Sequence, residues 1–134
     1  MRLVRLSFAA VSKRKVEAGR TFYDRLFAME PDLRPMFKSD MNVQHGKFIE
    51  MIGVIIGLLH DPSGLSQTLA QLAHRHRDYG VRDKDYDSVG EALLLTFADL
   101  LGDGFTPELK TAWRDLYAMV ASAMKRWSPQ TDKA

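Results

Sequence analysis

Apolar residues recur at helical spacing along almost the whole chain. No stretch alternates apolar and polar residues over the length of a strand, whereas residues three and four apart repeatedly share an apolar face. This pattern predicts an all-α fold of six to eight helices joined by short connections. At 134 residues, the chain is expected to form a single domain over residues 1–134.

The first half of the chain is predicted to contain three helices and one tight corner. The N-terminal helix is short and carries Leu3, Val4, Phe8 and Val11. The second helix, from about residue 16 to 29, directs inward Phe22, Tyr23, Leu26 and Phe27. Two prolines in the segment 31–37 allow one helical turn and then a corner. The third helix, from about residue 42 to 60, is apolar on nearly every side after residue 47, which predicts a central element.

The second half is predicted to contain three more helices. The sequence DPSG at 61–64 should end the central helix, and the next helix is expected in LAQLAHRHRDYGV, closed by Gly80 in a left-handed conformation. A helix from about residue 84 to 101 follows, with an inward face of Val89, Leu93, Thr96, Phe97 and Leu100. Thr106 then caps the last helix and Pro107 opens it. Its apolar stripe consists of Leu109, Trp113, Leu116, Val120, Met124 and Trp127.

Composition narrows the classes of partner. The net charge is +2 and the basic residues lie among acidic ones, so a nucleic-acid partner is not expected. The most apolar run, 48–59, contains Glu50 and is shorter than the roughly 20 residues of a membrane span, so no membrane partner is expected either. The N-terminus resembles no signal peptide, and the absence of cysteine fits a reducing cytoplasm, where we expect the protein.

Two of the four histidines stand close together in the helical stretch LAQLAHRHRDYGV. His74 and His76 are two residues apart, which on a helix is a rotation of about 200°. They therefore cannot chelate one metal together, and neither an HExxH motif nor a cysteine pair offers a zinc site. A metal bound by this stretch would be held by one histidine alone.

The spacing of the stretch directs His76 inward with Leu69 and Leu72, whereas His74 shares the outward face with Arg77. A single imidazole is what a haem iron accepts, because the porphyrin supplies the other four nitrogens. The same stretch is also typical of a solvated basic helix end near the negative pole of the helix dipole. Taken alone, the stretch favours this second interpretation.

Five blocks in a fixed order change that balance: FYDRLFAMEPDLRPMF, a buried helix that opens with Gln44, LAQLAHRHRDYGV, YDSVGEALL and FTPELKTAWRDLYAMV. In this order the chain resembles a bacterial single-domain globin, and it is similar to the globin half of flavohaemoglobins and to neuroglobin. The resemblance extends from about Leu3 to Trp127. It implies a globin fold around a b-type haem with a five-coordinate iron.

The resemblance implies a role for four residues in particular. His76 becomes the proximal ligand of the iron, and Phe37 the aromatic residue that stacks on the haem. Tyr23 would lie over the distal face with Gln44 beside it, so that both donate hydrogen bonds to bound O2 and slow its release. On the residues alone, Tyr23 is better explained as a half-buried core tyrosine and Gln44 as a surface residue of a first helical turn.

The resemblance also implies the wall and the edge of the haem site. The wall would consist of Phe48, Leu72, Val81, Tyr86, Val89 and Leu93. The edge, where a propionate could find a partner, would consist of Lys47, Arg75 and Tyr79, although Lys47 is equally explained as a solvated lysine.

Three further features of the sequence bear on function. Flavohaemoglobins support the proximal histidine with a Tyr and a Glu; Tyr86 matches the Tyr, but Ser128 stands at the Glu position, so the electronic push toward O–O chemistry should be weaker. His45 is adjacent to Gln44, and a slip of one residue would turn it toward the iron as a second histidine ligand. The first helix is expected to be short or truncated.

The implied function is reversible binding of O2, and of NO or CO, for oxygen storage, oxygen delivery or NO scavenging. One alternative is an NO dioxygenase that works with an external reductase, since no flavin or nicotinamide domain is expected in the 134 residues. A second is a gas sensor that signals through a partner, and a third is a helical interaction module without haem.

Overall fold

Six α-helices make up most of the chain in the computed structural model, which describes residues 2–37, 41–78 and 80–127, without the side chains of 36, 41–43 and 127. No strand occurs in these ranges. The all-α prediction is therefore confirmed. In chain order the elements are α1 (Arg2–Ser12), α2 (Lys15–Met29), the 3-10 turn η1 (Pro31–Met36), α3 (Met41–Gly57), α4 (Pro62–Asp78), α5 (Asp83–Leu101), the 3-10 turn η2 (Gly102–Gly104) and α6 (Pro107–Trp127).

The helix ends follow local rules that the sequence displays. Gly80 adopts a φ of 91°, the left-handed conformation expected of it after α4. The Thr106 hydroxyl accepts the backbone N–H of Leu109 at 3.2 Å, which confirms Thr106 as the cap of α6. Gly80 thus marks the end of α4, and Thr106 marks the start of α6.

The predicted boundary between α3 and α4 is wrong. The sequence DPSG begins α4 instead of only separating two helices, because Asp61 accepts the N–H of Gly64 at 3.1 Å and Pro62 occupies the first helical position. The central helix correspondingly ends at Gly57, three residues before the expected end at residue 60. Only a short turn thus joins α3 to α4.

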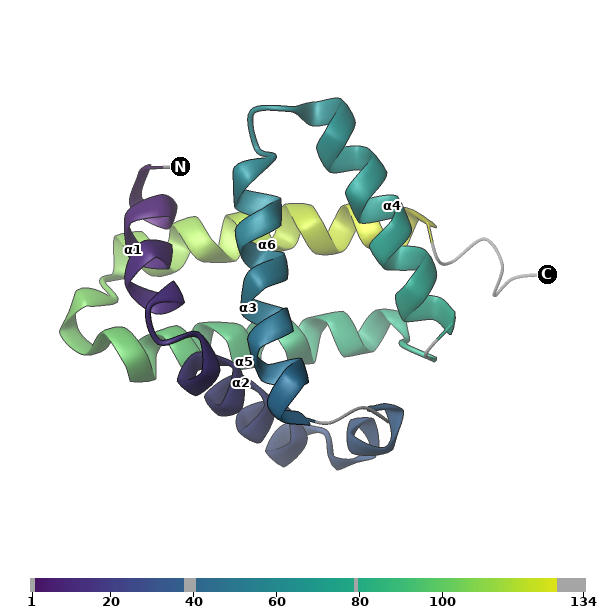
Figure 1. Cartoon of the computed structure of the whole chain (residues 1–134), viewed down its shortest axis with the longest axis horizontal. Helices are drawn as coiled ribbons and strands as arrows, with labels where there is room; N and C mark the ends of the chain where they lie inside the picture. Colours follow the sequence, from purple (N-terminus) through teal and green to yellow (C-terminus); the bar gives the residue numbers. More distant parts are fainter. Residues whose placement is uncertain (1, 38–40, 79, 128–134) are drawn as a thin grey trace.

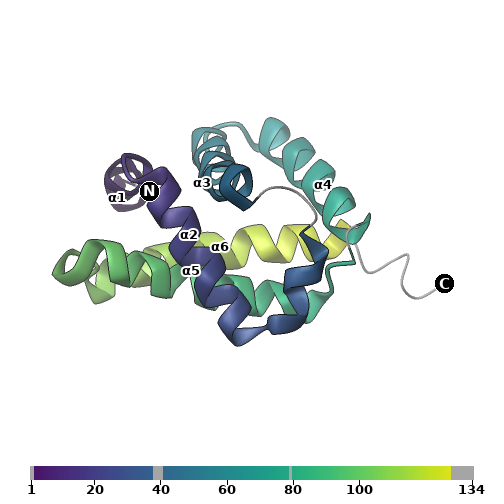
Figure 2. The ribbon, with the colours of Figure 1, turned by 60° about the horizontal axis from the view of Figure 1, so that its bottom comes forward.

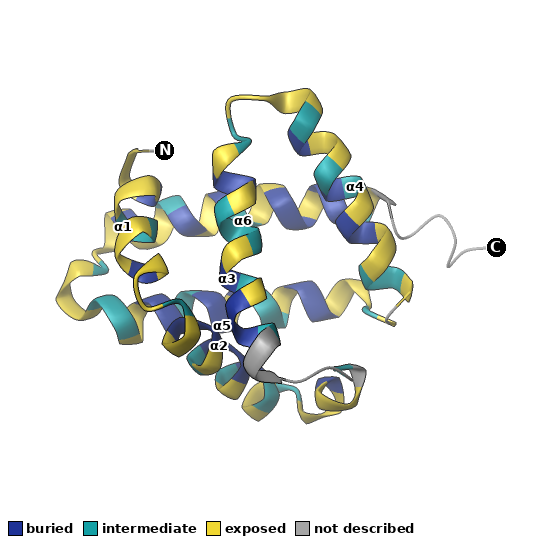
Figure 3. Ribbon diagram, viewed as in Figure 1, coloured by how far each residue is buried: buried dark blue, intermediate teal, exposed yellow. Residues whose placement is uncertain are grey.

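Two layers of helices build the molecule (Figures 1 and 2). The helices α5 and α6 form an antiparallel pair connected by η2, and buried positions alternate with exposed ones along both (dark blue and yellow in Figure 3). The helix α3 crosses this pair. The helix α1 closes one end, where the Trp113 indole of α6 donates a hydrogen bond to the Ser7 hydroxyl at 2.9 Å. Leu3 of α1 instead lies on the outer surface, 41% exposed.

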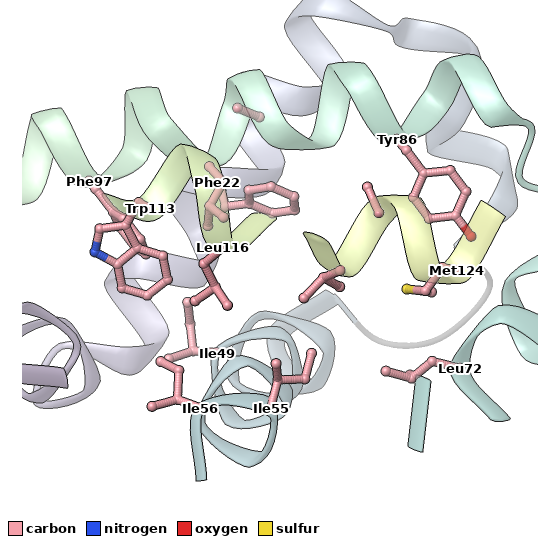
Figure 4. Close-up of a cluster of buried hydrophobic side chains, with 14 of the residues drawn as sticks. Phe22, Ile49, Ile55, Ile56, Leu72, Tyr86, Phe97, Trp113, Leu116 and Met124 are labelled. Atoms are coloured by element: carbon pink, nitrogen blue, oxygen red, sulfur yellow. The ribbon is translucent and has the colours of Figure 1, made fainter. Parts of the chain in front are cut away.

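Although a short turn joins them, α3 and α4 do not pack as a pair. The helix α3 packs mainly against α2, and α4 mainly against α6. The two helices therefore diverge from their shared turn (Figure 1). Figure 4 shows the result for the side chains: Leu72, Tyr86 and Met124 gather in one part of the view, apart from the cluster that contains Phe22, Ile49 and Trp113.

The crossing of α2 and α3 depends on a glycine. A Cβ atom at Gly19 would collide with the backbone carbonyl group of His45, so the two helix backbones are in direct contact there. Gly19 is one turn before Tyr23 on α2, and His45 directly follows Gln44 on α3. The glycine contact therefore sets the distance between the two predicted distal residues.

Replacing Gly19 by alanine should destabilise the protein, because the added methyl group forces the two helix backbones apart. We expect a loss of about 1–3 kcal/mol in the free energy of unfolding, the usual cost of overpacking, measured by urea denaturation. Gly57→Ala is the matched control, since a Cβ at Gly57 meets nothing within 4 Å. It should be neutral or slightly stabilising in this helical position; equal losses for both variants would show that the α2–α3 contact is not tight.

Candidate functional site

His76 lies in the last turn of α4, at the point where the helix stops. The backbone N–H of Val81 bonds to the carbonyl of His76 at 3.0 Å, and the N–H of Gly80 bonds to the carbonyl of Arg77, also at 3.0 Å. These bonds follow from the left-handed conformation of Gly80. They fix the backbone from which the His76 imidazole projects.

The ring of His76 is oriented by its own helix. Its Nδ1 is 2.7 Å from the carbonyl oxygen of Leu72, one turn earlier, so that Nδ1 carries the hydrogen and donates it. Burial lowers the pKa of His76 below its ordinary value, against the opposing effect of the Leu72 hydrogen bond, and Arg75 lowers it further. The imidazole is therefore neutral at pH 7, and Nε2 is left as the nitrogen with a lone pair for a metal.

The outward and inward faces of α4 are as predicted. Leu69 and Leu72 are buried and His76 is half-buried. The side chain of His74 is 62% exposed and lies beside Arg77 and Asp78, at 2.7 Å and 3.5 Å. Of the two neighbouring histidines, only His76 faces the interior.

Tyr86 of α5 lies beside His76. Its ring is stacked on that of His76, with centroids 6.3 Å apart and an interplanar angle of 19°. The hydroxyl of Tyr117, from α6, donates a hydrogen bond to the backbone carbonyl of Tyr86 at 2.5 Å. Sequence reasoning missed Tyr117, because no local pattern indicates a bond between two helices.

Tyr23 of α2 and Gln44 of α3 are in contact, as predicted. Tyr23 is only 4% exposed, and its oxygen accepts the Gln44 side-chain N–H at 3.1 Å. Burial raises the pKa of Tyr23 to about 12, although the Gln44 hydrogen bond opposes the rise. The hydroxyl is thus neutral, and since its oxygen accepts from Gln44, its own hydrogen is directed elsewhere. In this arrangement one hydrogen bond of Gln44 goes to Tyr23, which the sequence did not suggest.

Aromatic rings hold Tyr23 in place. Phe37 contacts it edge-on at 5.2 Å between centroids, and Phe48 does so at 5.8 Å. Phe48 also stacks on Phe22 at 3.9 Å and 12°. His45 is buried and its ring lies 5.7 Å from that of Tyr23. The expected candidates Phe37 and Phe48 are therefore grouped around Tyr23, and His45 joins them as a neighbour of Tyr23.

The remaining predicted residues divide into an apolar group and an exposed group. Leu72 and Leu93 are buried, and Val81 and Val89 are half-buried and pack against the core. Lys47 and Arg75 are exposed, as residues at the edge of a site would be. Two candidates, Tyr79 and Ser128, lie outside the described residues.

This donor set fits a haem and does not fit a protein-only metal centre. Within the described ranges no three His, Cys, Asp or Glu side chains group together to hold a metal ion. A haem iron needs only one neutral imidazole from the protein, and His76 offers it with Nε2 available. The buried Leu72, one turn before His76, and the ring of Tyr86 beside it suit a largely apolar group.

Comparison with known proteins decides the family. The family model described as Globin matches residues 20–124. The chain belongs to the globin family. The predicted resemblance is thereby confirmed, and membership implies haem iron and a gaseous ligand such as O2.

Individual globins are similar over almost the full length of the chain. Neuroglobin of Chaenocephalus aceratus is 30% identical over 148 residues, which cover 98% of this chain and 93% of that protein. Neuroglobin of Danio rerio is 30% identical over 138 residues, covering 92% and 87%. One similar solved structure is an engineered carbene transferase built on a candidate nitric oxide dioxygenase from Rhodothermus marinus. It has 26% identity and a TM-score of 0.87, and covers 98% of this chain and 92% of its own.

The helices of the described residues include none that is both long and apolar enough to span a membrane.

The raised pKa of Tyr23 should be visible in the stability of the apoprotein at alkaline pH. The unfolded tyrosine ionises near pH 10, whereas the folded one ionises near 12, so the stability due to this difference is present below pH 10 and is lost between pH 10 and 12. Its full extent is about 2–3 kcal/mol. Tyr23→Phe should lose less stability than the wild type over this interval in urea denaturation. A constant difference between the two proteins from pH 8 to 12 would contradict the raised pKa.

Proposed function

We propose that this globin is a single domain that holds haem b through Nε2 of His76 and reversibly binds O2, for storage, delivery or the scavenging of NO. The observation that carries the proposal is the state of His76. Its Nδ1 is held by the Leu72 carbonyl at 2.7 Å and its pKa is lowered by burial, so that a neutral imidazole with a fixed tautomer is ready for the iron. When bound, the haem iron supplies a coordination position for a diatomic gas.

The rest of the proximal side would keep the imidazole in one plane. Tyr86 would limit rotation of the His76 ring by stacking on it, and the buried Leu72 and Leu93 would belong to the apolar wall of the haem site. At the edge of the site, Lys47 and Arg75 are exposed cations that suit the haem propionates, and we propose the same role for Tyr79.

On the distal side, Tyr23 would be the hydrogen-bond donor to the gas ligand. Its oxygen accepts from Gln44, so the amide orients the hydroxyl while the hydroxyl hydrogen remains available. Because Tyr23 is neutral up to about pH 12, donation persists over the whole physiological range. Phe37 and Phe48 exclude water from the hydroxyl, which strengthens the hydrogen bond.

A second candidate function is NO dioxygenation with an external reductase. The observation in its favour is the 26% identical structure built on a candidate nitric oxide dioxygenase. For this activity the same residues would act: Tyr23 steadies the gas ligand and His76 holds the haem. Rapid NO consumption that continues only when a reductase is added would support this function; consumption of one NO per haem and no turnover with any reductase would favour storage or delivery.

Removal of the proposed ligand should abolish haem binding. His76→Ala should lose the Soret band of the reconstituted protein, and added imidazole should restore part of it by replacing the missing side chain. His74→Ala is the matched control, because this neighbouring histidine is exposed and should leave the spectrum unchanged. A Soret band of wild-type intensity in His76→Ala would remove His76 from the proposal.

Removal of the distal donor should release O2 faster. A hydrogen bond to a charged acceptor is worth about 1.5–3 kcal/mol, so Tyr23→Phe should raise the O2 dissociation rate about tenfold to a hundredfold, measured by stopped-flow.

The role of Gln44 can be separated from that of Tyr23 by a double-mutant cycle. If Gln44 acts by orienting Tyr23, Gln44→Leu raises the rate by less than Tyr23→Phe, and the double variant has the rate of Tyr23→Phe alone. Additive effects would instead show that Gln44 donates to O2 independently.

A further inference from the structure

Asp85, in the first turn of α5, is a buried carboxylate that the proposed function does not use. It is only 2% exposed, which is rare for an acidic residue. Its Oδ2 accepts the backbone N–H of Arg82 at 2.8 Å, and its own backbone N–H donates to the Arg82 carbonyl at 2.9 Å. The other carboxylate oxygen, Oδ1, is buried and has no hydrogen-bond partner among the described residues.

The role of Asp85 as a helix cap does not account for its charge. The bond to the Arg82 N–H needs one oxygen, and a side-chain amide offers such an oxygen without a charge. A buried carboxylate whose hydrogen bonds are incomplete destabilises the fold more than a neutral group does. The presence of a carboxylate at this position therefore indicates a use for the charge itself.

This charge is only partly neutralised. Nε of Arg82 lies 3.6 Å from Oδ2 of Asp85, but the side chain of Arg82 is 56% exposed. Water and salt screen an exposed guanidinium far more strongly than a buried carboxylate. A net negative charge thus remains inside the protein at the start of α5.

The charge of Asp85 acts on the residue that stacks on His76. Tyr86 follows Asp85 directly, and its ring centroid is 6.3 Å from that of the His76 imidazole. Burial, and after it the charges of Asp83 and Asp85, raise the pKa of Tyr86 to about 12. The field of the carboxylate therefore extends to the ring beside His76.

The corner between α4 and α5 holds the carboxylate in place. The N–H of Val81 donates to the carbonyl of His76 at 3.0 Å, and the N–H of the next residue, Arg82, donates to Asp85. These hydrogen bonds connect the helix end that carries His76 with the first turn of α5. The negative charge is thus fixed relative to His76 before any ligand binds.

We propose that Asp85 lowers the reduction potential of the iron that His76 would hold. Oxidised iron carries one more positive charge than reduced iron, so a fixed negative charge in a buried setting stabilises the oxidised state. Asp85 thereby offsets part of the weaker electronic push expected from Ser128. This inference rests on the proposed binding of haem by His76.

Asp85→Asn tests the charge and keeps the cap, because the amide oxygen can still accept the Arg82 N–H. The midpoint potential of the haem-loaded protein, measured by spectroelectrochemical titration, should rise by about 30–60 mV, which is a threefold to tenfold change in the reduction equilibrium. Arg82→Gln should lower the potential, because it removes the partial neutralisation and keeps the backbone N–H. A potential that does not rise in Asp85→Asn would overturn the proposal.

Asp83→Asn is the matched control, since Asp83 lies in the same helical turn and has the same charge but is exposed. Its effect on the potential should disappear near 1 M salt, where the Debye length is about 3 Å. The effect of Asp85→Asn should persist there, because the buried carboxylate is poorly screened. Loss of both effects in salt would contradict a charge that acts from inside the protein.

The iron–histidine stretching band in the resonance Raman spectrum separates the charge from a displaced histidine. In reduced Asp85→Asn the band should keep its wild-type frequency, because the corner is retained. A raised potential accompanied by a shifted band would assign the effect to the position of His76 and overturn the proposal. If His76 does not hold haem, the wild type itself lacks the band; a wild type with the band and an unchanged potential in Asp85→Asn refutes the role of Asp85 alone.

Discussion

The direct contact between the backbones of α2 and α3 determines how Tyr23 and Gln44 meet in this globin. Gly19 permits it, since any side chain there would meet the carbonyl group of His45. Because Tyr23 is one turn after Gly19 and Gln44 precedes His45, the contact brings a buried hydroxyl and an amide to 3.1 Å. The aromatic rings of Phe37 and Phe48 then pack around a hydroxyl whose position is already defined.

The surroundings of His76 are built differently, from short-range interactions within one helix end. The Leu72 carbonyl holds Nδ1 of His76 one turn away, and Gly80 ends α4 directly afterwards. Tyr86 contributes a long-range contact, from α5. The group around Tyr23 and the group around His76 thus belong to separate packing units, α2 with α3 and α4 with α6, which meet through α5.

Features that depend on neighbouring residues could be predicted from the sequence. Helical spacing indicated an inward His76 and an outward His74, and the preferences of Gly80 and Thr106 placed two helix ends correctly. The start of α4 was misplaced because Asp61 and Pro62 suit the end of one helix as well as the beginning of the next. Neighbouring residues were sufficient to predict the two faces of α4 and the helix ends at Gly80 and Thr106. They left the start of α4 ambiguous.

Contacts between helices could not be derived in this way. A glycine in the middle of a helix, such as Gly19 or Gly90, signals a close approach but does not name the partner, which here is His45 or Tyr117. The bond from Gln44 to Tyr23 likewise depends on a crossing angle that no single segment contains.

The Tyr23 hydroxyl accepts a hydrogen bond from Gln44 and has a single hydrogen of its own to donate. Such a donor favours a bound gas that carries negative charge over one that carries little. In the proposed role, Tyr23 would therefore distinguish O2 from CO by polarity, without any need for a difference in size.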